Sequence, residues 1–261
     1  MKAAQSILYT LVLPVVLLAT WWIVSYDSTN VYFPSLQRIV QVFPATWLEG
    51  GWQSRLVVDG FSSVWRLLFG FVVATVIAVA LGTLIGLMPR VRAFCEPALE
   101  LFRAIPGPVL VPIIGLFAGI GDTMKIIVVL LGCLWPILLN TVEGVRAVDS
   151  VMIDTARSYR LSPWRRITKL ILPAASPQIL AGMRQGLSVG IILMVISEMF
   201  AATNGLGFSV VQFQRNFALP EMWTGIIVLG LLGLTASVLF QSFESRSLRW
   251  YTGMRRAARD A

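Results

Sequence analysis

The chain has 261 residues, of which 57% are hydrophobic and only 13% are charged, and its mean hydropathy is +0.78. Soluble domains carry about 25% charged residues, so these values exclude a soluble fold and predict an all-α, polytopic membrane protein. The net charge of +8 does not indicate a nucleic-acid partner, because the basic residues border apolar stretches and do not gather with aromatics in a soluble patch.

Two features of the composition limit the chemistry of this chain. It contains no histidine, and its two cysteines, Cys95 and Cys133, both lie in apolar segments. Histidine-based triads and cysteine-rich metal sites are therefore excluded. No glycine-rich phosphate loop of the G-x-x-x-x-G-K-[ST] type occurs either. We expect no catalytic residue, no metal and no cofactor in this chain, so we do not expect it to be an enzyme.

Six apolar segments are candidates for membrane spans, most of them near or above the roughly 20 residues that cross a bilayer. They are Ile7–Ser25, Phe61–Met88, Phe94–Gly119, Met124–Asn140, Gln178–Ala202 and Trp223–Phe243. With the N-terminus inside, 14 basic residues lie on the cytoplasmic side and 4 on the outer side. The positive-inside rule therefore predicts that both termini are cytoplasmic.

These spans divide the chain into three parts. Residues 1–60 hold the first span and an external amphipathic segment. Residues 61–245 form the core, with a cytoplasmic loop at 141–177, and residues 246–261 form a basic cytoplasmic tail. In the external segment, Leu36–Phe43 predicts a short interfacial helix, and Trp47 and Trp52 suit the headgroup level.

Small residues recur every four positions in two of the spans. The second span has Gly70, Ala74, Ala78, Gly82 and Gly86, and the fifth has Gly182, Gly186 and Gly190. Such faces let helices approach closely in lipid. Either they pack helices within the chain, or one of them contributes to a dimer interface or a moving pore wall.

Two spans carry features that are unusual in a transmembrane helix. The stretch from Arg103 to Pro112 in the third span contains three prolines and a glycine, which disrupt a helix and indicate either a structural kink or a substrate path or hinge. Glu198 is the one acid well inside the fifth span, and it is either a structural acid that ties down the outer loop or pairs with another helix, or a group that faces an aqueous path. The candidate path residues are Arg103, Pro106, Met194 and Glu198.

A polar, basic segment from Asp154 to Pro173 interrupts the apolar pattern on the cytoplasmic side. Ser150 is a plausible N-cap for a helix from Val151 to about Tyr159. Ser162-Pro163 predicts the start of a second helix, which runs to about Ile171 and stops before Pro173. Ser176-Pro177 repeats the start signal for the fifth span. The two short helices form either a protein-docking element or an interfacial hairpin whose arginines bind anionic headgroups.

The same segment resembles the "EAA" loop of bacterial ABC importer permeases, E-A-A-x-x-x-G-x(9)-I-x-L-P. Ala156, Leu172 and Pro173 match this pattern. Four positions depart from it: Asp154 for glutamate, Thr155 for alanine, Arg160 for glycine and Leu170 for isoleucine. Because arginine lacks the conformational freedom of glycine, the corner at Arg160 cannot rely on a free positive φ, and we expect it to use another turn type.

Further motifs are similar to those of the nitrate/sulfonate/taurine subgroup of these permeases. They are Arg103-Ala-Ile-Pro, Gly119-Ile-Gly-Asp122, Gly182-Met-Arg184, Ser197-Glu-Met199 and Asn204-Gly-Leu-Gly207. The resemblance covers roughly residues 60–245 and implies a type I importer fold with six transmembrane helices.

The resemblance also implies a function and an assembly. The chain would be the permease subunit of an ATP-driven importer of a small, anionic organic solute in a bacterial inner membrane. Its partners would be two cytoplasmic ATPase subunits, a second permease copy and an external substrate-binding protein. The residues expected to couple it to the ATPase are Asp154, Thr155, Ala156, Tyr159, Arg160, Leu161, Trp164 and Pro173. The alternative is a secondary transporter or channel that works without an ATPase, for which we expect paired intramembrane charges or repeat symmetry.

Overall fold

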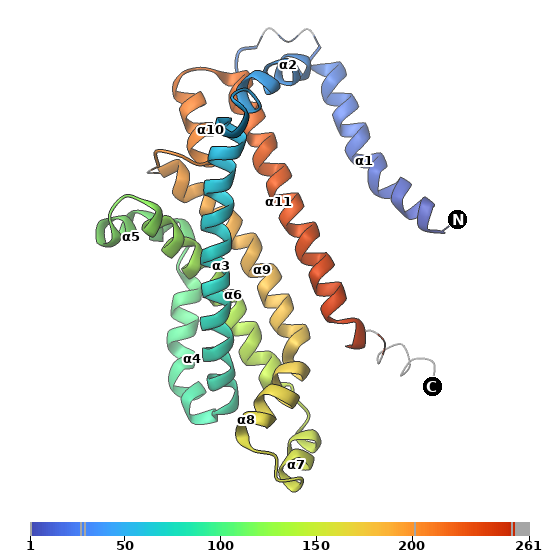
Figure 1. Ribbon diagram of the computed structural model, residues 1–261, viewed down its shortest axis with the longest axis vertical. Helices are drawn as coiled ribbons and strands as arrows, with labels where there is room; N and C mark the ends of the chain where they lie inside the picture. The colour runs from blue at the N-terminus through green and yellow to red at the C-terminus, as the bar shows by residue number, and fades with distance from the viewer. Residues whose placement is uncertain (1, 27, 29, 201, 252, 254–261) are drawn as a thin grey trace.

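The computed structural model describes residues 2–26, 28, 30–200, 202–251 and 253, and every regular element in this part of the chain is helical (Figure 1). The predicted tail at 246–261 lies mostly outside the described residues. The elements are α1 (Lys2–Val24), α2 (Leu36–Trp47), η1 (Gly51–Gln53), α3 (Arg55–Leu87), α4 (Pro89–Ala104), η2 (Gly107–Val109), α5 (Leu110–Ala118), α6 (Asp122–Arg146), α7 (Ser150–Ser158), α8 (Pro163–Arg166), η3 (Ile167–Ile171), α9 (Leu172–Phe200), α10 (Leu206–Arg215) and α11 (Leu219–Ser247).

Four of the six predicted spans coincide with helices that are long and apolar enough to cross a membrane. These helices are α3, α6, the continuous stretch from α8 to α9, and α11. The first predicted span coincides with α1. In the part of α1 whose side chains the structure describes, the apolar helix is the shorter stretch Val12–Val24. The fold class is therefore the predicted one, whereas the count of six uninterrupted spans is not reproduced.

The third predicted span, Phe94–Gly119, is not one straight helix. It is divided into α4 and the η2–α5 segment, which meet at 83°. The chain is extended at Ile105 and Pro106, with ψ angles of 122° and 120°. At Ile105 the cause is the following proline, which pushes the preceding residue out of the α region. Figure 1 shows α5 leaving the bundle about halfway along α3. The proline-rich sequence thus produces a break and not a mild kink.

The core of the bundle is α6, which packs against both α3 and α9. Glycines on the two neighbours make this close packing possible. A Cβ at Gly82 of α3 would lie 2.7 Å from Cβ of Thr141, and one at Gly182 of α9 would lie 2.6 Å from Cβ of Asn140. Both small-residue faces therefore pack helices within the chain, the first of the two interpretations offered above.

Helices α2, α10 and the start of α11 close the end of the bundle opposite to α7 and α8. The predicted helix at Leu36–Phe43 is confirmed as part of α2, which Ser35 caps by accepting from the Arg38 amide. The expected headgroup position of Trp47 is wrong: its side chain is fully buried and its Nε1 donates to Thr224 Oγ1 at 2.7 Å. An indole N–H that finds a buried partner is satisfied inside the protein. Trp52 is 89% exposed.

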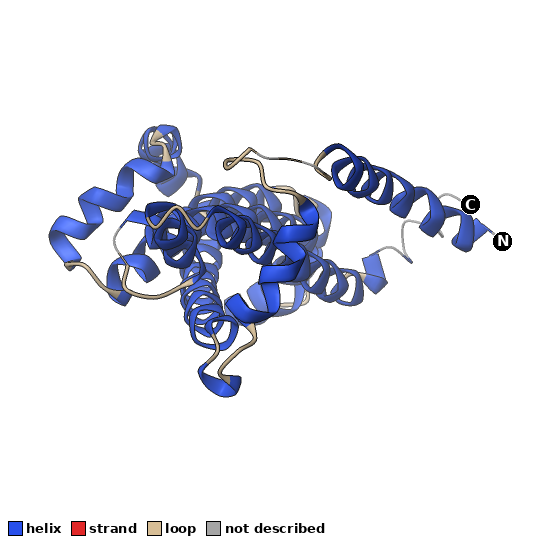
Figure 2. Cartoon of the chain, turned by 90° about the horizontal axis from the view of Figure 1, so that it is seen from above, coloured by secondary structure: helices blue, strands red, loops and turns tan. Residues whose placement is uncertain are grey.

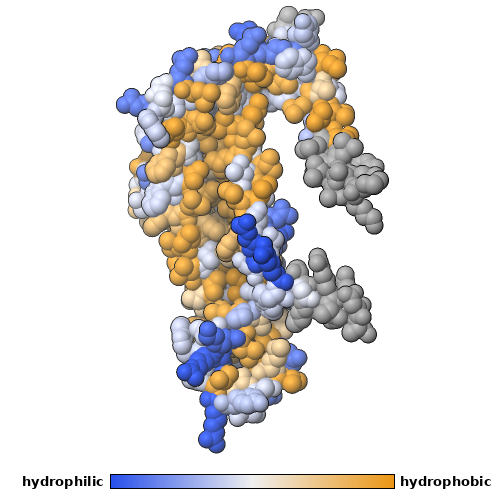
Figure 3. Space-filling view, turned by 45° about the vertical axis from the view of Figure 1, so that its right-hand side comes forward, coloured by the Kyte–Doolittle hydropathy of each residue, from blue (hydrophilic) through white to orange (hydrophobic). Residues whose placement is uncertain are grey.

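The distribution of apolar and hydrophilic side chains on the surface is the one expected of a membrane protein. Figure 3 shows a broad apolar band along the bundle, with hydrophilic side chains gathered towards its two ends. Helix α1 stands apart from the rest, as Figures 1 and 2 both show. Its C-terminal end is held where Trp21 packs against Phe33 and Trp223, with ring centroids 6.1 and 5.7 Å away.

Candidate functional site

The first candidate site is the corner formed by α7 and α8, which we call the coupling corner (residues 150–166). Helix α7 begins one residue earlier than the predicted cap implies. Asp149 is the N-cap, and its Oδ1 accepts from the Val151 amide at 2.8 Å, so Ser150 is already helical and the predicted cap is wrong. Asp and Ser cap helices about equally well, so composition alone does not choose between the neighbours.

Helix α7 ends in a left-handed turn centred on Arg160. Its φ is 53°, so the expectation that an arginine here uses another turn type is wrong. The Arg160 amide donates to the Arg157 carbonyl at 2.8 Å, and the Leu161 amide donates to the Ala156 carbonyl at 3.0 Å. This pair of bonds is a Schellman motif, which satisfies carbonyls left free at a helix end and normally favours glycine at the left-handed position. The chain thus keeps the turn despite a conformational cost of roughly 1–2 kcal/mol for a residue with a Cβ.

The second half of the coupling corner starts as predicted and ends differently. Ser162 caps α8 by accepting from the Arg165 amide, and Pro163 takes the first helical position. The predicted stop before Pro173 and the new start at Ser176-Pro177 are both wrong. The chain continues through the π-helical segment η3 into α9, and the Leu172 amide donates to the Ile167 carbonyl. A π-helical turn changes the hydrogen-bond spacing just before the proline, whose missing N–H could not continue an α-helical ladder.

The coupling corner presents large apolar side chains around a small recess. Val151, Tyr159 and Trp164 are 68%, 79% and 73% exposed. A cavity of about 530 Å³ lies between α7 and η3, lined by Val151, Met152, Thr155, Ala156, Tyr159, Leu161, Lys169 and Leu170. Ala156 is only 5% exposed. Exposed aromatics around a groove are typical of a protein-binding surface.

Asp154 and Pro173 lie at the margin of this surface. Asp154 is exposed and forms an ion pair with Arg157 one turn later, at 3.0 Å. Pro173 lies in α9, beyond η3. Of the predicted coupling residues, the structure therefore brings Thr155, Ala156, Tyr159 and Leu161 together around one recess, while Trp164 and Arg160 belong to the corner that frames it.

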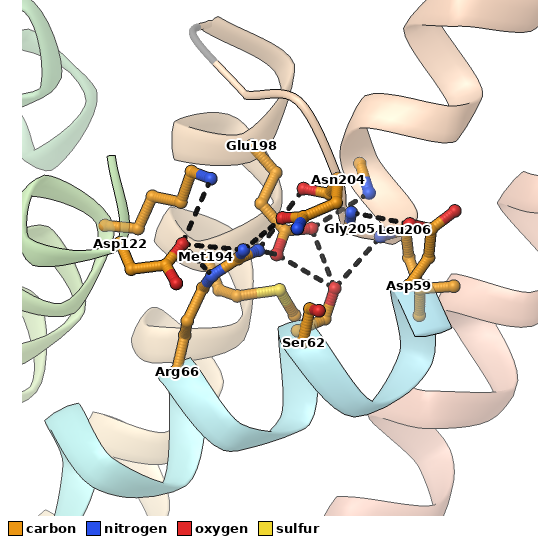
Figure 4. A network of polar contacts seen from close by, with 12 residues as sticks. Asp59, Ser62, Arg66, Asp122, Met194, Glu198, Asn204, Gly205 and Leu206 are labelled. Atoms are coloured by element: carbon orange, nitrogen blue, oxygen red, sulfur yellow. Dashed lines mark hydrogen bonds and ion pairs between the residues drawn. The ribbon is translucent and has the colours of Figure 1, made fainter. Parts of the chain in front are cut away.

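The second candidate site is a buried polar network near the opposite end, shown in Figure 4. Arg66 of α3 and Glu198 of α9 form an ion pair at 2.7 Å, with side chains 1% and 0% exposed. The Glu198 carboxylate also accepts from Ser63 Oγ at 2.8 and 2.9 Å and from the Gly207 amide at 3.0 Å. Glu198 therefore pairs with another helix and also holds the outer loop, which is the structural arrangement offered above.

The rest of this network extends to α6 and to the loop before α10. Arg66 also forms an ion pair with Asp122 at 2.7 Å and donates to the Asn204 side chain. Lys125, 2% exposed, lies 3.6 Å from the same Asp122 carboxylate. Asp59 accepts from the Gly205 amide at 2.9 Å and from Ser209 at 2.5 Å. Four helices (α3, α6, α9 and α10) and the loop before α10 are thus joined by charges that have polar partners.

Arg66 and Lys125 were not among the candidate residues of the sequence analysis. A signal was present for Arg66, because an ionisable side chain inside an apolar span is costly unless it is paired. It lies 132 residues from Glu198 in the sequence, and no local pattern links the two. The intramembrane charge pair expected of a secondary transporter is therefore present, but its groups are enclosed and their polar atoms are partnered within the fold.

The four candidate path residues fall into two environments. Arg103 and Pro106 are exposed at the break between α4 and α5, whereas Met194 and Glu198 are fully buried. The structure does not bring the four together. Among the described residues, no group of three or more histidine, cysteine or acidic side chains could hold a metal ion.

Comparisons with known proteins match most of the chain. The model of the family described as "Binding-protein-dependent transport system inner membrane component" matches residues 74–249. The chain is 28% identical to the putative aliphatic sulfonates transport permease protein SsuC of Bacillus subtilis (strain 168), over 92% of this chain and 86% of that protein. It is 29% identical to the taurine transport system permease protein TauC of Escherichia coli (strain K12), over 90% and 87%.

Two further matches agree with these. The chain is 28% identical to the nitrate import permease protein NrtB of Synechocystis sp., over 88% of this chain and 85% of that protein. Its fold is similar to a chain in an inward-facing structure of the MetNI methionine ABC transporter, with a TM-score of 0.63 and 18% identity, over 75% of this chain and 95% of that one.

Proposed function

We propose that this chain, which belongs to the family of binding-protein-dependent transport system inner membrane components, carries a small, anionic organic solute across a bacterial inner membrane. It is the permease subunit of an ABC importer of the nitrate, sulfonate and taurine subgroup. Three of its relatives are named for sulfonates, taurine and nitrate. All three cargoes bear a compact anionic group, so this shared chemistry supports an anion as the cargo here.

We propose that the coupling corner is where the ATPase binds. The recess between α7 and η3, with Tyr159 exposed at its rim and Ala156 in its wall, is the observation that carries this assignment. Two ATPase subunits, one for each of two permease copies, would each grip one corner and hydrolyse the ATP. Their closure would move the corner, and the rigid α8–η3–α9 stretch would transmit that movement into the membrane. A substrate-binding protein would deliver the cargo at the opposite, external end.

We propose that the path follows the break between α4 and α5. The exposure of Arg103 and Pro106 supports their lining it, and the burial of Met194 and Glu198 supports a bracing role behind it. A charged side chain at membrane depth normally faces protein or a water-filled cavity. This division keeps all four residues near the path but gives only two of them contact with the cargo.

The assignment of the coupling corner is tested by two substitutions. Ala156→Trp fills the recess, and Asp154→Lys reverses a charge at its margin. Both are expected to lower ATP-dependent uptake of taurine, used as the probe, by at least tenfold in proteoliposomes that contain the whole importer, because the corner no longer fits the ATPase.

The matched control is Glu143→Lys. Glu143 forms an exposed i,i+3 ion pair with Arg146 at 2.6 Å, as Asp154 does with Arg157, but it lies on α6 outside the corner. Its uptake should equal that of the wild type. If Ala156→Trp and Asp154→Lys still co-purified with the ATPase and transported normally, the docking assignment would be wrong. Uptake by the purified permease alone would instead support a secondary transporter.

A further inference from the structure

The break between α4 and α5 opens a cavity of about 440 Å³ against α6 and α9. Its walls combine aromatic and aliphatic side chains with three polar ones. They are Phe102, Arg103, Ile105, Gly107, Leu110, Leu131, Gly132, Trp135, Pro136, Leu139, Asn140, Gln185, Val189 and Leu193. Irregular backbone at membrane depth is tolerated where it is covered by protein or lines an aqueous cavity, and broken helices in transporters often form the substrate site.

The polar groups of this cavity supply hydrogen-bond donors and a positive charge. Arg103 is 62% exposed, and its guanidinium has five N–H groups. Asn140 Nδ2 donates to the Pro136 carbonyl at 2.8 Å and to Gln185 Oε1 at 3.2 Å. This contact occupies the oxygen of Gln185, and among the described residues its amide nitrogen has no partner. The free donors of Gln185 and the charge of Arg103 therefore share one cavity.

None of the described residues that line this cavity is acidic. Arg103 forms an ion pair with Glu100, one turn earlier on α4, at 2.9 Å. That pair is exposed on both sides, 62% and 57%, so water screens it and it is weak. One contact to Glu100 leaves most of the guanidinium donors available to another anion.

The apolar walls suit the organic part of such an anion. Phe102 and Trp135 stack with ring centroids 5.1 Å apart and an interplanar angle of 8°, forming a flat surface. Leu193 also lines the cavity, packed so closely against its neighbours that a Cβ at Gly107 would lie 3.0 Å from it and one at Gly132 would lie 2.1 Å from it. A mostly apolar pocket with a few convergent polar groups is the usual form of a small-molecule site.

We infer that this cavity is an anion-selecting site of the permease itself, in which Arg103 and the Gln185 carboxamide bind the sulfonate, carboxylate or nitrate group of the cargo and the Phe102–Trp135 stack contacts its organic part. This inference rests on the proposed function, because it places a binding step on the transport path. It goes beyond it by giving the permease, and not only the external binding protein, a share in choosing the cargo.

The experiment measures how the cavity treats charge, and it needs no knowledge of the cargo. Both native cysteines are replaced by alanine, and Val189→Cys places one thiol in the cavity wall while leaving Arg103, Asn140 and Gln185 intact. The purified permease is then treated with two thiol reagents of similar size: 2-sulfonatoethyl methanethiosulfonate, which is an anion, and 2-(trimethylammonium)ethyl methanethiosulfonate, which is a cation. For each reagent, the rate of reaction with the cavity cysteine is divided by the rate of its reaction with a free thiol in solution.

The anionic reagent is expected to react relatively faster than the cationic one. Arg103→Gln should lower this anion-to-cation ratio by roughly fivefold, as expected for one unit charge several ångströms away in a hydrated cavity. Glu100→Gln should raise the ratio, because it removes the charge that competes for Arg103. The matched control is Arg90→Gln, which removes an exposed arginine outside the cavity and should leave the ratio unchanged.

Leu139→Cys provides a second position in the cavity wall, so the result does not depend on one variant folding. The inference is overturned if neither thiol reacts with either reagent, or if the ratio in Arg103→Gln equals that in the cysteine background. The proposed function fails in a different way, through loss of ATPase binding or of ATP-dependent uptake, and the charge ratio of the cavity does not depend on either.

Discussion

The carboxylate of Glu198 illustrates how this chain accommodates charge at membrane depth. It accepts hydrogen bonds from Ser63, Arg66 and the Gly207 amide, which come from α3 and from the start of α10. Removing one partner of a buried ion pair strands the other charge, at a cost of about 3–5 kcal/mol. The pair therefore constrains the fold strongly even if its net contribution relative to an apolar pair is small.

Glu198→Gln should accordingly destabilise the protein. The amide would present an N–H₂ group where Arg66, the Gly207 amide and the Ser63 hydroxyl now all donate. The Arg66 charge would keep only Asp122 as an acidic partner. Thermal unfolding of the purified permease in detergent should show a midpoint lower by on the order of 10 °C, given about 2–4 °C per kcal/mol for a chain of this size.

The control for this prediction is Glu100→Gln, which removes one partner of the exposed pair with Arg103. Exposed pairs contribute about 0–1 kcal/mol, so its midpoint should stay within a few degrees of the wild type. A second variant, Arg66→Met combined with Glu198→Met, should lose less stability than the two single changes added together. An unchanged midpoint for Glu198→Gln would show that the buried pair is not needed to hold the outer loop.

At the scale of elements, the main stabilising feature is the close packing of α6 between two glycine faces. Gly190 of α9 is the clearest case, because a Cβ there would lie 2.6 Å from Sγ of Cys133 and 3.3 Å from Leu67. Cys133 is itself fully buried. Overpacking in a well-packed core costs typically 1–3 kcal/mol.

Gly190→Ala should therefore lower the unfolding midpoint, and Cys133→Ala in the same chain should restore most of the loss by removing the sulfur atom that the new methyl group meets. Gly230→Ala is the matched control: Gly230 also lies within a helix, α11, but no atom comes within 4 Å of its Cβ position. Its midpoint should be unchanged or higher, since alanine is the better helix former. A double variant no more stable than Gly190→Ala alone would contradict this packing geometry.

The elements also show what the sequence could and could not predict. Hydropathy located four of the spans, and Ser162-Pro163 located the start of α8, because these signals are local. The break at Pro106 was expected as a disruption for the same reason. The run of α8 through η3 into α9 was not predicted, since a proline is normally read as a stop and the π-helical turn that accommodates Pro173 leaves no mark in the hydropathy pattern.

The same difference between local and long-range signals separates the two candidate sites. The coupling corner was found from one continuous segment, although the left-handed turn at Arg160 was missed because its two hydrogen bonds outweigh the preference against a side chain there. The network of Arg66, Glu198 and Asn204 was not found as a unit. Its members come from two helices and a loop, and a single sequence carries no information on which distant charges meet.

At the scale of the whole molecule, the two candidate sites lie at opposite ends of the bundle, and this fixes a sidedness that can be measured. The coupling corner, with Arg157, Arg160, Arg165 and Arg166, lies at one end in Figure 1, and α2 and α10 lie at the other. If the corner meets a cytoplasmic ATPase, then α2 must face outwards.

Two single-cysteine variants in the cysteine-free background test this: Gln53→Cys near α2 and Arg90→Cys at the start of α4, both at exposed positions. In intact spheroplasts, a membrane-impermeant maleimide should label Gln53→Cys only, and Arg90→Cys should be labelled once the membrane is opened. The opposite pattern would place the coupling corner outside, where no ATPase could reach it.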